Sequence, residues 1–180
     1  MNNRTSGLGA RLSILFRPDR WKYIKRTDAD KECVFCQAGR LESSFDTLTV
    51  YKTNYSMIVL NKYPYNTGHI LVIPKRHEGD YLTLTQSEFE DLHNTLRLAV
   101  KAVKDVYEAH GTNLGLNLDK AAGAGIPDHL HYHVVPRFRG DMNFFPLIAE
   151  TKVVPEALEE TYRKLSAYFR NKANIMGAKG

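Results

Sequence analysis

The chain has 180 residues, of which 43% are hydrophobic and 25% are charged, a balance that is ordinary for one globular domain with a substantial core. The formal net charge of +5 suits an anionic ligand, but an excess of this size is also common on plain protein surfaces. No apolar run is long enough to span a bilayer and the N-terminus lacks a signal-peptide core, so we expect a single-domain cytoplasmic protein over residues 1–180 that does not engage a membrane.

The N-terminal part of the chain carries an aromatic and basic cluster, followed by both cysteines. Residues 1–13, like residues 170–180 at the other end, are expected to be flexible tails. We expect residues 14–24 to pack onto the domain or onto a partner subunit. Cys33 and Cys36 form a Cys-x-x-Cys pair, which in a cytosolic chain indicates metal or redox chemistry before it indicates a structural disulfide.

Apolar periodicity predicts five strands and two helices. The order of three strands, a long helix and two more strands predicts an α+β fold with an antiparallel five-stranded sheet, one long helix and one C-terminal helix. The first two strands are separated by Thr53 and Asn54, which predicts a β-hairpin. Strands are expected at 47–52, 55–60, 69–74, 114–118 and 129–135, and helices at 85–110 and 155–169.

The long helix has clear signals at both ends. Thr85 with Glu88 matches a capping box, and Gly111 suits the position just after the helix, where a left-handed backbone is common. Apolar residues recur every three or four positions, so we expect that face to lie in the core and not to line a cofactor pocket.

Three of the seven histidines, His129, His131 and His133, occupy alternate positions. A strand has a side-chain period of two, so the three imidazoles would lie on one face of it. A solvated or hydrogen-bonded histidine face is the structural alternative, but three histidines in register directly after a glycine-rich loop favour a functional site. Imidazole can act there as a nucleophile or acid–base group, or as a metal ligand, and a three-histidine zinc site is the second choice.

The loop before these histidines contains Gly123, Ala124 and Gly125. Small residues allow backbone N–H groups to approach a ligand closely, so such a loop can bind phosphate oxygens. Taken alone, the pattern is more often a bend. It becomes informative because it adjoins the histidine row.

The segment His129–Val135 resembles the His-x-His-x-His-apolar-apolar signature of the histidine triad (HIT) superfamily, whose members hydrolyse or transfer nucleoside phosphates. Residues 68–77 are similar to the third-strand block of that family, and residues 115–117 are similar to the block before its phosphate loop. More narrowly, the chain resembles the bacterial diadenosine tetraphosphate phosphorylase branch, close to the fragile-histidine-triad hydrolases, at residues 16–24, 123–136 and 140–144.

The resemblance covers residues 14–169 and implies a nucleotide substrate, an adenine dinucleoside polyphosphate. It also implies a homodimer and no organic cofactor. Nucleic acid is not an expected partner, because the basic and aromatic cluster at residues 14–24 occurs once and no RNA-binding signature accompanies it.

In that family the middle histidine is the nucleophile, which implies His131 here. It would attack the α-phosphorus, expel the rest of the polyphosphate and hold a nucleotidyl-histidine until phosphate or water accepts the nucleotide. The attack needs one free ring nitrogen, so we expect the other to donate to a backbone carbonyl, while His133 donates to a phosphate or bridging oxygen. Backbone amides near Ala124 and Gly125 would bind the developing charge. The implied nucleotide-binding residues are Asn61, Asn117, Gly123, Ala124, Gly125 and His133.

Three positions depart from the family pattern. Hydrolases commonly carry Gln where Gly125 stands, so its absence favours an acceptor other than water or a different placement of the acceptor. Asp119 stands where relatives often have Gly and places a negative charge near an anionic ligand. Phe138 stands where the phosphorylase branch often has Trp.

A second constellation consists of Cys33, Cys36, His77 and His129, because two thiolates and two imidazoles are enough for a closed tetrahedral zinc site. Some HIT proteins and related uridylyltransferases carry zinc at matching positions, which implies that His129 is a ligand and not a catalyst. Such a zinc ion would be structural and would join the cysteine segment to the sheet. The alternative is a pair of reduced surface thiols, with His77 simply ending a strand.

The leading hypothesis is an enzyme that cleaves dinucleoside polyphosphates, such as diadenosine tetraphosphate, through nucleotidyl-His131, by phosphorolysis or hydrolysis. Within the same class, a nucleoside phosphoramidate or adenylyl-lysine hydrolase is the alternative, and it differs in the leaving group. From other classes, the alternatives are a non-catalytic nucleotide-sensing binding protein and a zinc-dependent nucleic-acid binder. The intact His131, His133 and small-residue loop argue against a binding protein that has lost its chemistry.

Overall fold

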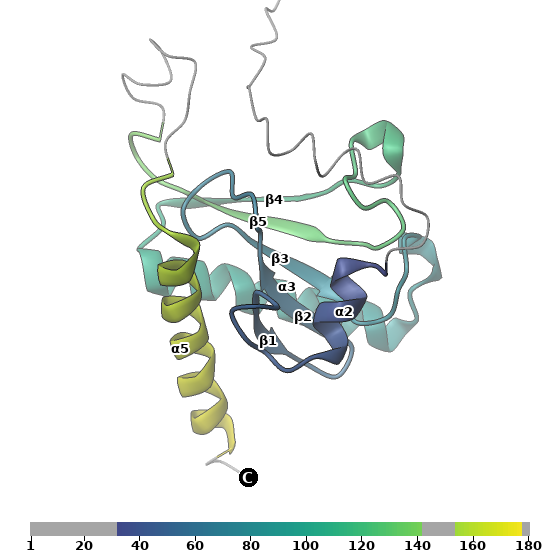
Figure 1. Ribbon diagram of the computed structural model, residues 1–180, viewed down its shortest axis with the longest axis horizontal. Helices are drawn as coiled ribbons and strands as arrows, with labels where there is room; N and C mark the ends of the chain where they lie inside the picture. Colours follow the sequence, from purple (N-terminus) through teal and green to yellow (C-terminus); the bar gives the residue numbers. More distant parts are fainter. Residues whose placement is uncertain (1–31, 142–153, 178–180) are drawn as a thin grey trace, which may run out of the picture. The chain divides into compact units, whose positions relative to one another are not determined.

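The structure is a computed structural model that describes residues 32–141 and 154–177, and these residues belong to one compact unit. Its centre is a five-stranded sheet with the strand order β1-β2-β3-β5-β4 (Figure 1). The expectations for residues 1–13 and 14–24 lie outside the described residues, and one domain over the whole chain stays a prediction. In chain order the elements are α2 (Val34–Arg40), β1 (Thr49–Lys52), β2 (Ser56–Leu60), β3 (Ile70–Pro74), a 3-10 helix (Tyr81–Thr83), α3 (Gln86–Tyr107), β4 (Gly111–Leu116), a second 3-10 helix (Lys120–Ala122), β5 (Tyr132–Arg137) and α5 (Leu158–Gly177).

Every neighbouring pair of strands in the sheet is antiparallel. β1 and β2 form the predicted hairpin, and β2 then pairs with β3 from Ser56 opposite Pro74 to Leu60 opposite Ile70. After α3 the chain returns through β4 at the sheet edge, and β5 lies between β4 and β3. The predicted α+β fold with an antiparallel five-stranded sheet, a long helix and a C-terminal helix is therefore confirmed.

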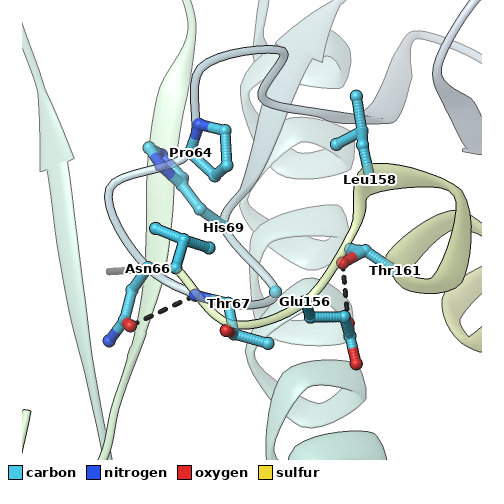
Figure 2. Close-up of a pocket in the computed structure, with 9 residues that line it drawn as sticks. Pro64, Asn66, Thr67, His69, Glu156, Leu158 and Thr161 are labelled. Atoms are coloured by element: carbon cyan, nitrogen blue, oxygen red, sulfur yellow. Dashed lines mark hydrogen bonds between the residues drawn. The ribbon is translucent and has the colours of Figure 1, made fainter. Parts of the chain in front are cut away.

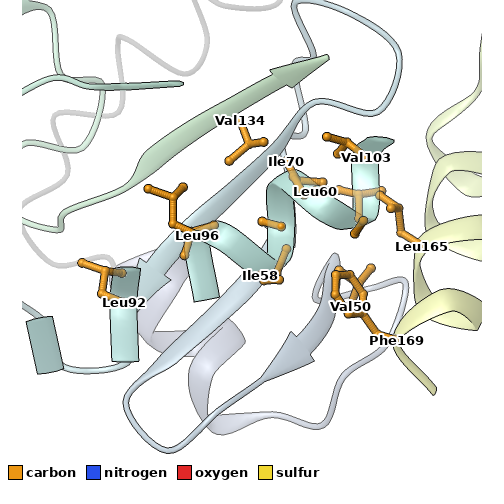
Figure 3. Close-up of a cluster of buried hydrophobic side chains, with 13 residues drawn as sticks. Val50, Ile58, Leu60, Ile70, Leu92, Leu96, Val103, Val134, Leu165 and Phe169 are labelled. Carbon is orange, nitrogen blue, oxygen red and sulfur yellow. The ribbon is translucent and has the colours of Figure 1, made fainter. Parts of the chain in front are cut away.

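Both faces of the sheet are covered, which explains why β2 and β3 are buried along their whole length. α3 and α5 cover one face, and their apolar side chains meet those of the strands in a single cluster (Figure 3). α2 covers the other face through Phe35. The strand side chains on the first face are Val50, Ile58, Leu60, Ile70, Val72 and Val134, and those on the second are Met57, Val59, Leu71 and Ile73.

α3 begins as predicted but ends earlier. Thr85 Oγ1 accepts from the Glu88 N–H (3.3 Å), and the Glu88 carboxylate accepts from the Thr85 N–H (2.9 Å), so the capping box is present. The helix ends at Tyr107, and Glu108 takes the left-handed backbone with φ 50°. The expected position of Gly111 just after the helix is therefore wrong, because this residue already pairs with β5 as the first residue of β4.

Two other helical segments differ from the expectation. Periodicity does not predict α2, because two turns with only Phe35 and Ala38 buried make too short a pattern. α5 runs to Gly177, so it extends beyond the predicted end at residue 169. Neither proline nor glycine interrupts the helix before its last residue. None of the described helices is both long and apolar enough to cross a membrane.

The last two strands are shifted relative to the prediction. β4 begins at Gly111, three residues before the predicted start, and β5 begins at Tyr132 and not at residue 129. Before Tyr132 the chain leaves the sheet ladder, because the Leu130 N–H donates to the Glu78 carbonyl (2.7 Å) in the loop after β3. The first two histidines of the row therefore precede the strand.

Candidate active site and metal centre

His131 and His133 lie side by side, while His129 joins a neighbouring cluster. His133 is in β5 opposite Leu71, on the face of the sheet that α2 covers, and His131 comes directly before the strand. The ring centroids of His131 and His133 are 5.3 Å apart. The His129 ring is fully buried, and its Nδ1 lies 3.4 Å from Cys33 Sγ. The three imidazoles do not share a regular strand face, because strand pairing begins only after His131.

His131 is held as a neutral imidazole with one nitrogen free. Its Nδ1 lies 2.8 Å from the His129 carbonyl oxygen, which can only accept, so Nδ1 carries the proton. Burial lowers the pKa of His131, and the bond to the carbonyl offsets this only in part. No described residue is hydrogen-bonded to Nε2. Nε2 therefore presents a lone pair, as the expected nucleophile requires.

A fourth histidine, His69, determines which ring nitrogen of His133 carries the proton. The Tyr65 N–H donates to His69 Nδ1 (3.0 Å), so His69 carries its proton on Nε2. His69 Nε2 lies 3.0 Å from His133 Nδ1 and donates to it, which leaves the proton of His133 on its own Nε2. Burial lowers the pKa of His69 to about 3 and that of His133 to about 4, so both rings are neutral near pH 7.

Sequence reasoning missed His69 and Tyr65 as parts of this site. His69 stands before an apolar run and is predicted only as a strand residue, although a buried histidine needs a hydrogen-bond partner. Tyr65 stacks on His133, with ring centroids 5.8 Å apart and 16° between the planes. The signal that could have found His69 is its place in residues 68–77, the second block that carries the family resemblance.

Asn61 lies at the same corner, directly after β2. Its Oδ1 accepts from the Tyr63 N–H (2.9 Å), and its Nδ2 is 3.3 Å from His69 Nδ1. The structure therefore brings this predicted nucleotide-binding residue to the histidines, with its amide oriented by the loop. Asn117, which follows β4, is exposed and makes no side-chain hydrogen bond within the described part of the chain.

Among Gly123, Ala124 and Gly125 of the glycine-rich loop, one backbone donor is unused. The Gly123 N–H donates to the Lys120 carbonyl (3.0 Å), and the Ala124 N–H donates to the Asp119 carbonyl (3.3 Å). The Gly125 N–H has no acceptor among the described residues. Asp119 has φ 64° and ψ 170°, a backbone conformation that glycine adopts far more readily than other residues. Of the predicted anion-binding amides, that of Gly125 is available without rearrangement of the loop.

A separate pocket lies against the loop that carries His69 (Figure 2). The segment just before α5 and the first turn of α5 form its other wall, where the Glu156 carboxylate accepts from Thr161 Oγ1 (2.7 Å) and from the Tyr107 hydroxyl (2.8 Å). The pocket contains neither of the predicted catalytic histidines. It is therefore distinct from the predicted phosphate site.

The four predicted metal ligands, Cys33, Cys36, His77 and His129, converge, with their donor atoms all within 4.8 Å of one another. Cys36 Sγ lies 3.2 Å from His77 Nδ1, and the Nδ1 atoms of the two histidines are 3.3 Å apart. Tetrahedral zinc with ordinary bonds to sulfur and nitrogen would separate such atoms by about 3.3–3.8 Å. The donor set therefore fits one tetrahedral zinc ion.

One further observation agrees with a metal at this place. The His129 Nε2 donates to the Pro74 carbonyl (2.8 Å), which leaves Nδ1 with a lone pair toward the sulfurs. Burial and the neighbouring Cys33 raise the pKa of the Cys36 thiol to about 11. Two thiols this close ionise readily only when a cation binds them, and zinc supplies that charge.

Two cationic side chains hold the segments that carry the predicted metal ligands. Lys52 Nζ donates to the Ala38 carbonyl (2.9 Å) and its neighbours at the C-terminal end of α2. Arg76, next to His77, binds the Glu88 carboxylate through Nε (2.6 Å) and a terminal nitrogen (3.0 Å). The hydrogen bonds from Arg76 and from the start of α3 lower the pKa of Glu88 to about 2. The capping box of α3 is thus joined to the loop that carries His77.

Residues 42–140 match the family model described as HIT domain, which is more than half of the chain. The chain therefore belongs to the HIT family, and the resemblance seen in the histidine row is confirmed.

Three known proteins place the chain within that family. An AP-4-A phosphorylase from Mycobacterium tuberculosis is 38% identical over 170 residues, which cover 89% of this chain and 87% of the relative. A bis(5'-nucleosyl)-tetraphosphatase (asymmetrical) from Schizosaccharomyces pombe is 31% identical over 119 residues, which cover 66% of this chain and 62% of the relative. The crystal structure of a zinc-bound histidine triad family protein from Mycobacterium smegmatis has a TM-score of 0.62 and 27% identity, and covers 80% of this chain and 97% of that one.

Proposed function

We propose that this chain cleaves dinucleoside polyphosphates, such as diadenosine tetraphosphate, at the α-phosphorus through a covalent nucleotidyl-His131, with phosphate or water as the acceptor. The observation that carries the proposal is the free Nε2 of His131, held by its Nδ1 bond to the His129 carbonyl and placed beside His133. The expectation of a HIT-family enzyme is confirmed, because the named relatives are a phosphorylase and a phosphohydrolase of this kind.

In the first step, Nε2 of His131 forms a bond to the α-phosphorus, and the bond from that phosphorus to the bridging oxygen breaks. Diadenosine tetraphosphate then releases ATP and leaves an adenylyl group on the imidazole. In the second step, an oxygen of phosphate or water attacks the same phosphorus and the phosphorus–nitrogen bond breaks. The product is ADP with phosphate and AMP with water, and His131 regains its lone pair.

His133 is suited to assist both steps. Because His69 donates to its Nδ1, the Nε2–H of His133 is the group that can donate to a phosphate or bridging oxygen. The Gly125 N–H, which has no acceptor among the described residues, can bind the negative charge that develops on the phosphoryl oxygens. Both donors are already formed before the substrate binds, so little reorganisation is needed.

The test is a product assay with diadenosine tetraphosphate, with and without inorganic phosphate. ADP that forms only with phosphate identifies a phosphorylase, and AMP with ATP identifies a hydrolase. Faster cleavage of an adenosine phosphoramidate would favour the alternative hydrolase.

In the His131→Ala variant turnover should be abolished while nucleotide affinity is kept, and full activity in this variant would end the proposal. Salt-sensitive binding of plain oligonucleotides without turnover would point to a nucleic-acid binder.

The covalent intermediate can be sought directly. A phosphoramidate bond to histidine is labile in acid and stable in base, so the reaction should be stopped with alkali. Intact-protein mass spectrometry should then show one adenylyl group on the wild type, and peptide mapping should assign it to His131. An adduct on another residue would contradict the assignment.

The four converging side chains support a structural zinc ion. Cys33, Cys36, His77 and His129 would hold it, and four protein ligands leave no open position for substrate. The ion would supply positive charge that keeps both thiolates ionised and joins α2 to the sheet. The zinc-bound histidine triad protein from Mycobacterium smegmatis supports the choice of zinc as the metal.

A homodimer is the proposed assembly. β4 lies at the edge of the sheet and pairs only with β5 within the described residues, and Leu114 on it is 50% exposed. An unpaired edge with exposed apolar side chains is a common site of subunit pairing. Light scattering after size-exclusion chromatography should report twice the mass of the chain. The cytoplasmic location stays a prediction.

A further inference from the structure

Phe35 links the metal centre to the proposed nucleophile. It stands between the two cysteine ligands, at the start of α2, and is only 9% exposed. Its ring centroid lies 5.4 Å from that of His129, with 86° between the planes, and 5.4 Å from that of His131, with 50° between the planes. Both distances are within the range of aromatic contact. One side of the His131 imidazole is therefore packed against a residue from the metal-binding helix.

The position of Phe35 depends on how α2 is anchored. A helix of seven residues is not stable by itself, so its place must be set by its contacts. Its C-terminal end is held by Lys52, which donates to backbone carbonyls there. At its N-terminal end, Cys33 and Cys36 flank Phe35 as members of the metal cluster. The metal would thus fix the end of the helix that carries Phe35.

The second restraint on His131 leads to the same cluster. The Nδ1–H of His131 donates to the carbonyl of His129, and the ring of His129 is itself one of the four ligands. The ring packing from Phe35 and the hydrogen bond that His131 donates to the His129 carbonyl together define the rotation of the imidazole. Both originate in residues that belong to, or lie between, the metal ligands.

We propose that Phe35 is a positioning residue for His131, and that the zinc-anchored α2 holds Phe35 against this imidazole. The inference rests on the proposed function, in which Nε2 of His131 must point at the α-phosphorus. Without the ring of Phe35, the imidazole gains a free side and can rotate away from that direction. The metal centre then does more than join α2 to the sheet, because it orients the reacting nitrogen through a neighbouring side chain.

The experiment compares Phe35→Ala with Phe35→Tyr and with Met57→Ala. Phe35→Tyr keeps an aromatic ring against the imidazole. Met57 belongs to the same apolar cluster but lies on β2, which β3 separates from β5. Each variant is measured for zinc per chain, thermal unfolding, and kcat and KM with diadenosine tetraphosphate. Long-range proton–nitrogen NMR spectra report the tautomer of His131, assigned by its loss in His131→Asn.

The expected result is specific to Phe35→Ala. Its kcat should fall about 10- to 100-fold with KM within about threefold, because a misdirected nucleophile slows the chemical step more than binding. Zinc content should stay at one per chain, and the His131 spectrum should change from one Nδ1–H tautomer to an exchanging mixture. Phe35→Tyr and Met57→Ala should keep kcat within about threefold of the wild type and the wild-type tautomer.

Two results would overturn the inference. One is an unchanged kcat and an unchanged His131 tautomer in Phe35→Ala that retains zinc. The other is an equal fall of kcat in Met57→Ala, since the effect would then follow from lost packing in general. A failure of the proposed function looks different: the wild type would not cleave the dinucleotide, yet the His131 spectrum would still separate Phe35→Ala from both control variants.

Discussion

His69 Nε2 lies 3.0 Å from His133 Nδ1, and this contact decides which nitrogen of His133 faces a substrate. His69 accepts from the Tyr65 N–H through its other nitrogen, so its only proton is available for donation to His133. A histidine outside the three-histidine row thus sets the hydrogen-bonding state of the last member of that row. The contact joins positions that are 64 residues apart in the sequence.

This contact predicts a loss of activity in His69→Phe. The ring shape is kept, but His133 loses the donor that holds its Nδ1 as an acceptor, and it can then adopt either tautomer. We expect kcat with diadenosine tetraphosphate to fall roughly 10- to 100-fold. His69→Gln, whose amide can still donate, is the matched control and should recover part of the activity. An unchanged kcat in His69→Phe would show that the hydrogen bond between His69 and His133 does not contribute to activity.

The bond between Arg76 and Glu88 predicts a pH-dependent stability difference. Glu88→Gln removes a buried carboxylate that accepts from Arg76 and from the start of α3, so the free energy of unfolding should fall by about 1–3 kcal/mol at pH 7. The pKa of Glu88 is lowered from 4.5 to about 2. Its stabilisation is therefore fully present above pH 4.5 and is lost as the pH falls toward 2.

Urea unfolding of wild type and Glu88→Gln at a series of pH values measures this difference. Other acid-sensitive groups, including the metal ligands, are common to both proteins and cancel in the comparison. The difference in the free energy of unfolding between the two proteins should be largest above pH 4.5 and should decrease below it. A free-energy difference that stays constant or increases in acid would contradict the role of the Glu88 carboxylate.

The converging donor atoms predict that Cys33→Ser loses the metal. Serine is a poor zinc ligand, and without the ion the cysteine segment is no longer joined to His77 and His129. We expect one zinc per chain in the wild type by elemental analysis, and a free energy of unfolding about 3 kcal/mol lower in the variant. Treating the wild type with a strong chelator should lower its melting temperature similarly. Equal melting temperatures for all three samples would refute a structural zinc.

The backbone of Asp119 predicts that two substitutions there differ. Asp119→Gly removes both an unfavourable backbone conformation and a negative charge near the phosphate loop. The free energy of unfolding should rise by about 1 kcal/mol, and KM for diadenosine tetraphosphate should fall about threefold. Asp119→Asn removes only the charge, so it should share the change in KM without most of the gain in stability. A higher KM in both variants would mean that Asp119 itself helps to bind the substrate.

Element boundaries show where local pattern suffices. The Thr85–Glu88 capping box is a local arrangement, and α3 begins where it predicts. The end of the same helix is set by tertiary contacts, because Gly111 pairs with β5 and does not follow the helix directly. The position of α2 is also set by tertiary contacts, because it depends on Lys52 and on the cysteine–histidine cluster. Short elements whose stability comes from distant contacts carry too little periodicity to be recognised.

The amino-acid sequence alone predicted the five strands, the two long helices, the histidine row and the set of four candidate metal donors, because periodicity and side-chain chemistry can be read from the residues themselves. Only the tertiary structure decided what each imidazole does. His129 turns to the cysteines, His131 donates to a backbone carbonyl, and His133 accepts from His69, which leaves its own proton on Nε2. These roles depend on which ring nitrogen meets which partner. The partners of His129 and His133 come from distant segments that pack together, and the His131 ring meets a carbonyl two residues away in a segment that is held by the loop after β3.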